Sequence, residues 1–345
     1  MTTGIKTVTF GEIMLRLSPP GAERFFQSPS LSATFGGGEA NVAVSLAHFG
    51  LASHYVTRLP ANPIGDAALR SLRAEGVRVD FIQRGGERLG IYFAETGASQ
   101  RGSTVVYDRA GSAVSQVRPG DIPWAEVLDG TAWFHVTGIT PALGSAVAAA
   151  TREAVEAARA AGVRVSLDLN YRAKLWSKAD ARQVMRPLVA LTDVVVANEE
   201  DIQASLGLEV RGADVIGGRL DVEGYREVAE RIVAEFGVKT VAITLRESRS
   251  ASHNGWSAVL YDVPDGQFHR SQHYEIAVVD RIGGGDAFAA GLIFGLVTGR
   301  GADAALRFAV AASALKQTIP GDFNRASVAE VDRLAKGDES GRVQR

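Results

Sequence analysis

One short segment combines three consecutive glycines with an acidic side chain and then enters an apolar stretch. Residues 280–291 read DRIGGGDAFAAG. The first turn of a helix presents N–H groups without partners and a partial positive charge, and glycines let an anion approach the backbone. We therefore predict that Gly283, Gly284 and Gly285 form an anion-binding turn at the start of a helix.

Asp286, directly after these glycines, has two interpretations. A carboxylate at a helix start can simply cap the helix, which stabilises it by about 1 kcal/mol. Consecutive glycines, however, lose more backbone entropy on folding than a cap requires, and a ligand close to the backbone would offset that loss. We therefore predict that Asp286 is a general base beside the bound anion.

A second glycine cluster, GGGEANVA at residues 36–43, also precedes a predicted helix. It could be no more than a flexible strand-to-helix turn. Asn41 favours a ligand site, because an amide in the first turn has poor helix propensity but can hydrogen-bond a hydroxylated ligand. We predict that Gly37, Gly38 and Asn41 contact a sugar. Neither cluster has the Gly-Lys-Ser/Thr of a Walker loop or the spacing of a dinucleotide fingerprint.

A third candidate is the acidic segment Asn198-Glu199-Glu200-Asp201, which follows an apolar run. Ligands of open α/β sheets bind at the carboxyl edge, where acidic groups can hold Mg²⁺ through its waters. The alternative is an acidic first turn that complements a helix dipole. His135 lies in a strongly apolar run, and we interpret it as a hydrogen-bonded core residue.

Short β-branched runs alternate with longer runs of helical period, which predicts βαβ units around a largely parallel sheet. Segments 12–35 and 89–112 break this alternation, and we predict that they form a small β-sheet lid on one domain spanning residues 1–345, with a disordered tail at 337–345. The predicted strands are 6–10, 55–59, 132–137, 163–169, 193–197 and 239–245. The predicted helices are 39–49, 65–75, 144–161, 179–191, 225–236 and 302–317.

The composition is that of an ordinary globular protein, with 46% hydrophobic and 22% charged residues. The net charge of -2 gives no positive field for nucleic-acid binding, and the absence of Cys excludes disulfides and thiolate metal sites. The chain starts without a secretory signal, and its most apolar stretch, 287–297, is too short to span a bilayer. We predict a cytoplasmic protein without nucleic-acid or membrane partners, and a homodimer because exposed lid strands often pair.

The two glycine clusters, in this order and spacing, resemble the two signatures of the ribokinase-like, or phosphofructokinase B, family of carbohydrate kinases. The resemblance extends from Phe10 to about Asn324, with Arg281 in place of the usual Thr and Gly284 in place of the usual Ala. It implies a three-layer α/β/α sandwich with a mostly parallel central sheet and a small β-sheet lid. It also implies ATP-dependent phosphoryl transfer, in which Asp286 activates the acceptor hydroxyl.

Within the family, the chain is most similar to kinases of 2-keto-3-deoxygluconate, which they convert to its 6-phosphate. The similarity rests on residues 90–93, 106–109, 168–172, 175–177 and 319–322. It implies that Tyr92, Tyr107, Arg109 and Arg172 line the sugar site with Gly37. Guanidinium groups pair bidentately with carboxylates, so two arginines favour an acidic sugar.

The resemblance also implies a nucleotide site. Asn198 and Asp201 match an element that positions Mg²⁺ and phosphate, and the shorter Asp favours contact through water. The adenine would lie between Thr244 and the helix that carries Ala311 and Ala314, and a K⁺ ion could bind at Asp280. Two alternatives stay open: a kinase of a neutral ketose (fructose, tagatose), ribose or a nucleoside, and a sugar-binding protein without catalysis.

Overall fold

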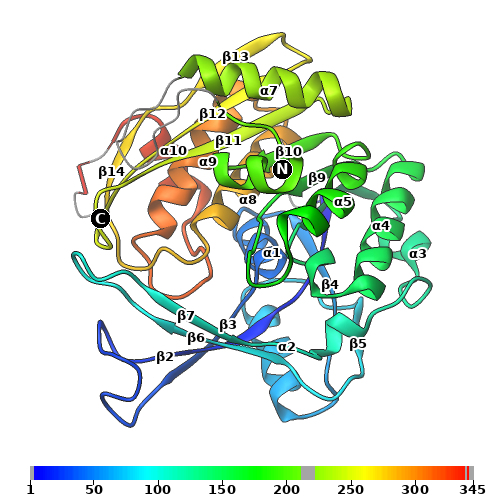
Figure 1. Ribbon diagram of the computed structural model, residues 1–345, viewed down its shortest axis with the longest axis vertical. Helices are drawn as coiled ribbons and strands as arrows, with labels where there is room; N and C mark the ends of the chain where they lie inside the picture. Colours follow the sequence, from blue (N-terminus) through cyan, green and yellow to red (C-terminus); the bar gives the residue numbers. More distant parts are fainter. Residues whose placement is uncertain (1–3, 211–221, 339, 342–345) are drawn as a thin grey trace.

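The computed structural model describes residues 4–210, 222–338 and 340–341, and its centre is a large β-sheet (Figure 1). In sheet order the strands are β13 (Gln267–Arg270), β12 (His253–Asp262), β11 (Thr240–Ser248), β10 (Val194–Ala197), β9 (Arg164–Asp168), β8 (Thr131–Thr137), β1 (Lys6–Phe10), β4 (Ala52–Leu59) and β5 (Ile82–Arg84), with β14 (Tyr274–Ala277) paired to β12. From β11 to β5 every pair is parallel.

All six predicted strands are present in this parallel part, which confirms the expected mostly parallel sheet. The structure adds the antiparallel strands β12, β13 and β14, which were not predicted. Strand β13 is mostly exposed and β14 buries only alternate residues, so neither shows the continuous apolar run of a strand buried on both faces.

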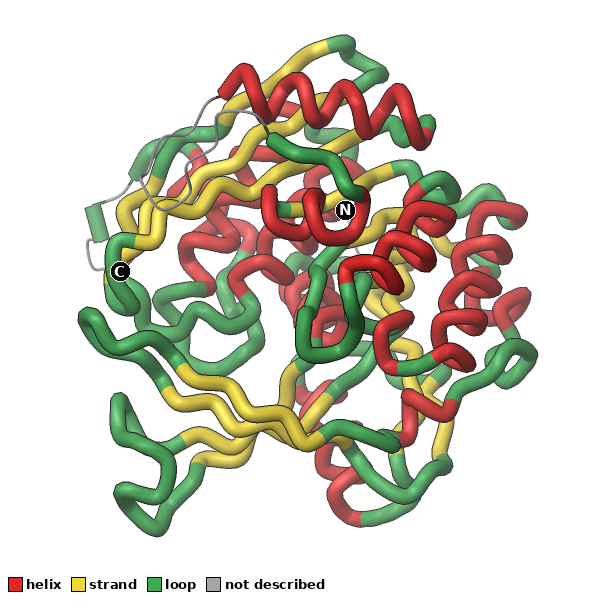
Figure 2. The backbone as a smooth tube through the Cα atoms, viewed as in Figure 1, coloured by secondary structure: helices red, strands yellow, loops and turns green. Residues whose placement is uncertain are grey.

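Helices cover both faces of the large sheet, because successive side chains of each strand point to opposite faces. On β10, Val195 packs in one apolar cluster, whereas Val194 and Val196 pack in another. Figure 2 shows the strands running between these helical layers. The first cluster is covered by α3 (Trp124–Leu128), α4 (Ser145–Ala160), α5 (Lys178–Val189), α6 (Glu199–Leu206) and α7 (Val222–Phe236). The second is covered by α1 (Gly38–His48), α8 (Gly284–Val297), α9 (Ala302–Lys316) and α10 (Val328–Ala335).

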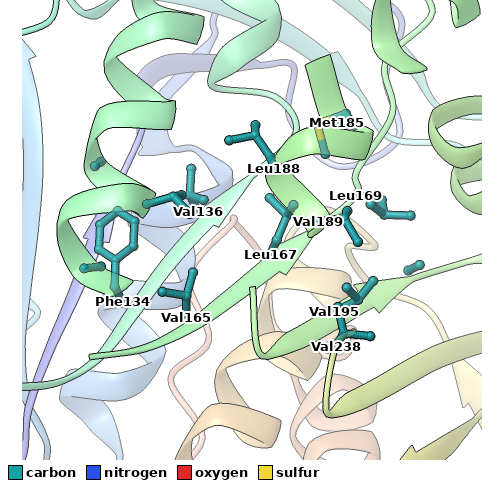
Figure 3. Packing of buried hydrophobic residues seen from close by; sticks show 14 of the residues in the cluster. Phe134, Val136, Val165, Leu167, Leu169, Met185, Leu188, Val189, Val195 and Val238 are labelled. Atoms are coloured by element: carbon teal, nitrogen blue, oxygen red, sulfur yellow. The ribbon is translucent and has the colours of Figure 1, made fainter. Parts of the chain in front are cut away.

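The remaining helix, α2 (Pro63–Ala74), packs with α1 against β4, and the short turns η1 (Ala113–Gln116) and η2 (Pro141–Leu143) connect elements. All six predicted helices are confirmed. Figure 3 shows part of the first cluster, which includes Phe134, Leu167 and Val195 of the strands and Leu188 of α5. His135 is a core residue as predicted: its Nδ1 lies 2.8 Å from Ser166 Oγ, and burial lowers its pKa to about 3.

A second, four-stranded sheet is built from the two segments that break the α/β alternation. Its order is β3 (Ser32–Gly36), β2 (Met14–Ser18), β6 (Gly90–Glu95) and β7 (Thr104–Asp108). The expected small β-sheet is therefore confirmed, and in Figure 1 it projects from the body below the large sheet. Residues 339 and 342–345 of the predicted tail lie outside the described residues. Among the described helices, none combines the length and apolar character that a bilayer crossing requires.

Candidate active site

The N-termini of helices α1 and α8 meet, so the two glycine clusters form one site. Asn41 Nδ2 donates a 2.7 Å hydrogen bond to Asp286 Oδ2. A Cβ built on Gly38 would lie 3.7 Å from Asp286 Oδ1. Residues separated by more than 240 positions in the chain are thus in direct contact. Asn41, which was predicted to bind a sugar, and Asp286, which was predicted to be a base, therefore lie side by side.

Two of the glycines are required by the backbone. Gly283, the N-cap of α8, has φ +84, and a Cβ there would lie 2.2 Å from the carbonyl oxygen of Asp322. A Cβ on Gly37 would lie 1.9 Å from the carbonyl oxygen of Glu12. Gly285 differs, because a Cβ there would meet nothing within 4 Å. Packing does not require glycine at position 285, and a side chain would enter open space.

The amides of this turn are not equivalent. The Gly284 N–H donates to the carbonyl oxygen of Arg281 at 3.3 Å, and a Cβ at Gly284 would face Gln317. In this structure the amide of Gly284, which was predicted to face an anion, already has a partner within the turn. Within the described part of the chain, the N–H groups of Gly283, Gly285 and Asp286 make no hydrogen bond. These three amides are available to an anion.

Asp286 is not the helix cap. It is the third residue of α8, whose N-cap is Gly283, and α8 has no side-chain cap hydrogen bond. The capping interpretation is therefore excluded. Its side chain is partly exposed, lines the cleft, and accepts the bond from Asn41. Burial raises the pKa of Asp286 to about 6, against the opposing effects of Asn41 and Arg172.

A cleft of about 430 Å³ lies over the two helix N-termini, at the carboxyl ends of β8, β9, β10 and β11. This is where open α/β sheets bind their ligands. It brings together most of the predicted residues: Gly37, Gly38, Asn41, Tyr92, Tyr107, Arg109, Arg172, Asn198, Asp201, Thr244, Gly283, Gly285 and Asp286. Gly284, Asp280, Ala311 and Ala314 are absent from its lining.

Of the three residues predicted to contact adenine, one lines the cleft and two do not. Thr244 lines the cleft, and its hydroxyl lies 3.4 Å from the carbonyl oxygen of Ala197. Ala311 and Ala314 on α9 are buried in the second apolar cluster, at 0% and 5% exposure. They pack within the helical layer, and neither side chain lines the cleft.

Asn198 and Asp201 both line the cleft but are bonded to each other. Asn198 is the N-cap of α6, where its Oδ1 accepts from the Asp201 N–H at 2.8 Å and its Nδ2 donates to Asp201 Oδ2 at 2.8 Å. The acidic segment is therefore the first turn of α6, as expected if its charges complement the helix dipole. Burial, first of all, raises the pKa of Asp201 to about 7, and the Arg172 charge opposes this shift.

One guanidinium, that of Arg172, acts electrostatically on several acidic groups of the cleft. The Arg172 charge opposes the burial that raises the pKa values of Asp168, Asp201 and Asp286. Among the described residues, no three carboxylates or imidazoles converge into a metal site. A Mg²⁺ ion in this cleft would therefore keep most of its waters and take its other oxygens from a phosphorylated ligand, as is usual for this ion.

The small sheet contributes a wall of aromatic and basic side chains. Tyr92 and Tyr107 have ring centroids 6.0 Å apart, and the Arg109 guanidinium lies 5.3 Å from the Tyr107 centroid. Arg109 is 8% exposed and forms an ion pair with Glu12, while its Nε has no hydrogen-bond partner among the described residues. The Arg109 guanidinium lines the cleft wall, and a guanidinium in such a place is suited to an anionic or hydroxylated ligand.

A buried network ties this wall to the glycine turn. Arg16 of β2 donates to Asp322 Oδ1 at 2.8 Å and pairs with Asp280 Oδ2 at 2.7 Å. Asp322 Oδ2 also accepts from the Tyr92 hydroxyl at 2.5 Å. The Asp280 carboxylate additionally accepts from the amides of Ile282 and Gly321. The residue predicted to bind K⁺ therefore already has several donors within the protein.

Several cleft residues were not among the predicted site residues, and four with acidic or basic side chains come from separate segments of the chain. Asp168 ends β9 and Asp322 follows a Pro-Gly turn, and both lie in segments that carried the family resemblance. Arg246 and Arg281 line the same cleft, and Arg281 donates only at 3.3 Å or more, to the carbonyl oxygens of Ala251 and Ser250. The sequence marked Arg281 as unusual, because it replaces the usual Thr of the family motif. Only the tertiary structure shows that Arg281 and Arg246 line the same cleft.

Comparison with known proteins decides the family. The model for pfkB family carbohydrate kinases matches residues 5–325. The chain belongs to the pfkB family of carbohydrate kinases. The resemblance inferred from the two glycine clusters is thereby confirmed, and this kinase is a phosphotransferase that acts on a carbohydrate hydroxyl.

The relatives of this kinase share its full length. It is 51% identical to the 2-dehydro-3-deoxygluconokinase of Thermotoga maritima, whose crystal structure matches with a TM-score of 0.92 over 96% of this chain and 100% of that chain. It is 34% identical to the 2-dehydro-3-deoxygalactonokinase of Haloferax volcanii, over 97% of this chain and 98% of the relative. A ribokinase-type E. coli protein, solved with ATP and Mg²⁺, is 20% identical with a TM-score of 0.79 over 96% and 99% of the two chains, and confirms the fold.

Proposed function

We propose that this kinase phosphorylates the 6-hydroxyl of 2-keto-3-deoxygluconate, which is the sugar acid also called 2-dehydro-3-deoxygluconate. The observation that carries the proposal is the guanidinium of Arg109, which lies in the wall of the cleft beside the Tyr107 ring. The names of the Thermotoga and Haloferax relatives support an acidic sugar with a keto-deoxy backbone. A neutral ketose has no carboxylate to offer such a group.

The sugar would lie between the small sheet and the two helix N-termini. Tyr92, Tyr107 and Arg109 supply one wall, and Gly37 and Asn41 supply the other. Arg172 stands between the sugar space and the acidic groups of the cleft floor, where its charge offsets Asp168, Asp201 and Asp286. We propose that Arg109 and Arg172 together hold the sugar carboxylate, which turns the opposite end of the sugar towards Asp286.

Asp286 would take the proton of the acceptor hydroxyl as the γ-phosphoryl group of ATP is transferred. The Asn41 amide fixes its Oδ2 at 2.7 Å, so the second carboxylate oxygen is left for the sugar. The free amides of Gly283, Gly285 and Asp286 would stabilise the charge on the transferring oxygens, a contribution typically worth about 100-fold or more in rate. Magnesium bound to the triphosphate, near Asn198 and Asp201, would neutralise its charge.

We further propose that the small sheet acts as a lid that excludes water from the cleft, since water competes with the sugar as acceptor. Three finer predictions from the sequence remain to be measured on the purified protein. The rate with potassium replaced by tetramethylammonium tests a K⁺ site at Asp280. Sedimentation tests the homodimer, and cell fractionation tests the cytoplasmic location.

A substrate screen with purified enzyme tests the acid-sugar proposal. ADP release is followed with 2-keto-3-deoxygluconate, 2-keto-3-deoxygalactonate, fructose, tagatose and ribose, and the product is identified by mass and by the position of its phosphate. We expect kcat/KM for the two keto-deoxy acids to exceed that for each neutral sugar by at least about 100-fold, the loss expected when a buried polar group stays unpaired. Turnover of fructose or tagatose without turnover of either acid would refute the proposal.

A further inference from the structure

A lysine side chain is completely buried behind the glycine turn. Lys316, the last residue of α9, is 0% exposed. Its Nζ donates to the carbonyl oxygen of Asp280 at 3.1 Å and to that of Ile319 at 3.3 Å. Its Cε lies 3.2 Å from the place that a Cβ on Gly283 would occupy. The ammonium group therefore touches the start of the turn, and its side chain contacts the residue that caps α8.

Helix capping alone does not explain this burial. A lysine at the end of a helix can bond the last carbonyl groups and complement the dipole while it stays exposed. Lys336, next to the end of α10, is exposed in this way. The contact with Ile319 has this local explanation, but the contact with Asp280 joins α9 to the turn before α8. Burying an ammonium group is costly unless a specific arrangement offsets the lost hydration.

The charges around Lys316 connect it to the reacting groups. Its pKa is lowered by burial, and the opposing effects come from Asp280, Asp322 and Asp286. The positive charge of Lys316 in turn lowers the pKa of Asp286. Among the described residues, the charged groups that act on Lys316 or Asp286 are Arg16, Arg172, Asp168, Asp280 and Asp322, and Asn41 hydrogen-bonds Asp286.

We propose that Lys316 is a positioning residue for phosphoryl transfer, holding the turn at Asp280–Gly283 and supplying a fixed positive charge behind the amides of α8. The proposal rests on the function proposed above, because it assigns those amides to the transferring phosphoryl group. A charge that is already in place needs no reorganisation during the reaction, which makes it more effective than an exposed one. Lys316 touches neither substrate in this arrangement and acts through the turn.

The test replaces the charge and keeps the shape. Lys316→Met has a similar length without charge, Lys316→Gln keeps a hydrogen-bond donor without charge, and Lys336→Met is the matched control at another helix end. For both Lys316 variants we expect kcat to fall by about 100-fold while the KM for the sugar acid stays near the wild-type value. We also expect the acidic limb of the pH–rate profile to move to higher pH, because Asp286 loses a neighbouring positive charge.

A merely structural lysine predicts a different pattern. Thermal unfolding would shift, but folded Lys316→Gln would keep the wild-type kcat and the wild-type acidic limb, and this result would overturn the proposal. If neither variant folds, Lys316 is a stability element and the proposal also fails. Wild-type protein that phosphorylates no sugar acid would instead refute the proposed function itself, so the two failures are distinguishable. Lys336→Met should match the wild type in every measurement.

Discussion

At the scale of single residues, the site depends on one carboxylate whose surroundings suit it to act as a base. Asp286 has a polar partner in Asn41, a partly exposed face on the cleft, and a pKa raised by burial to about 6. A base with a pKa a little below neutral is ionised at physiological pH yet still accepts a proton in the transition state. A carboxylate that only capped a helix would not need these three properties together.

Replacing Asp286 with Asn should abolish turnover while leaving the fold intact. An amide cannot take the hydroxyl proton, but it has nearly the same size, and its oxygen can still accept from Asn41. We expect kcat to fall by about 100-fold or more, with ADP binding retained in calorimetry. Because burial disfavours the charge of Asp286, the variant should unfold at the same or a higher temperature. Near-normal turnover would exclude Asp286 as the base.

The pH dependence of kcat/KM should show an acidic limb at about pH 6. Its direction follows from the shift: the raised pKa of Asp286 means that the active carboxylate is lost as the pH falls through about 6, earlier than for an ordinary aspartate. Rates are measured with saturating ATP and limiting sugar, together with thermal unfolding at each pH to exclude denaturation. A limb near pH 4 would show that burial does not tune the base.

At the scale of elements, the start of α8 combines two kinds of glycine that look alike in the sequence. Gly283 needs its left-handed conformation and its close contact with the Asp322 backbone. Gly285 needs neither, since open space surrounds it within 4 Å. Glycine at position 283 therefore serves the fold, whereas glycine at position 285 keeps the cleft open above the free amides.

Alanine substitutions at Gly283 and Gly285 should therefore have opposite effects. Gly285→Ala should fold with unchanged or higher stability, because alanine favours a helix by up to about 1 kcal/mol over glycine, while its methyl group obstructs the anion and lowers kcat/KM for ATP. Gly283→Ala should lower the free energy of unfolding by more than 1 kcal/mol or so, through strain and contact with Asp322. Urea unfolding and ATP kinetics on both variants check this; equal activities would contradict it.

At the scale of the whole molecule, a buried ion network joins the small sheet to the glycine turn at the start of α8. Arg16 lies on β2 and is 4% exposed, yet both its ion-pair partners, Asp280 and Asp322, belong to the loops that frame the start of α8. Tyr92 of β6 reaches the same Asp322. A movement of the small sheet would therefore also move the loops at the start of α8, because buried side chains connect them.

Arg16→Met should destabilise the protein far more than a matched change at an exposed arginine in the loop between β2 and β3. Removing Arg16 leaves two buried carboxylates without their cation, which typically costs about 3–5 kcal/mol. The control is Arg24→Met, whose ion pair with Glu95 is at 3.2 Å and whose side chain is 64% exposed, so about 1 kcal/mol or less is expected. Chemical denaturation of both variants measures the difference; similar losses would show that the network does not link the two sheets.

The local pattern of the sequence was sufficient for the parallel strands other than β5, for the six predicted helices, for the small sheet and for the two glycine clusters at helix starts, because periodicity and glycine runs are short-range signals. It did not reveal β12–β14, which extend the large sheet beyond β11 as antiparallel strands. Nor could it distinguish the bonded amide of Gly284 from the free ones, or show that Ala311 and Ala314 pack away from the cleft.

Only the tertiary structure decided which distant groups meet: Asn41 with Asp286, Arg16 with Asp280 and Asp322, and Lys316 with the Asp280 carbonyl. The physical reason is that hydrogen bonds and ion pairs act over a few ångströms of space, whereas sequence patterns report only neighbours along the chain.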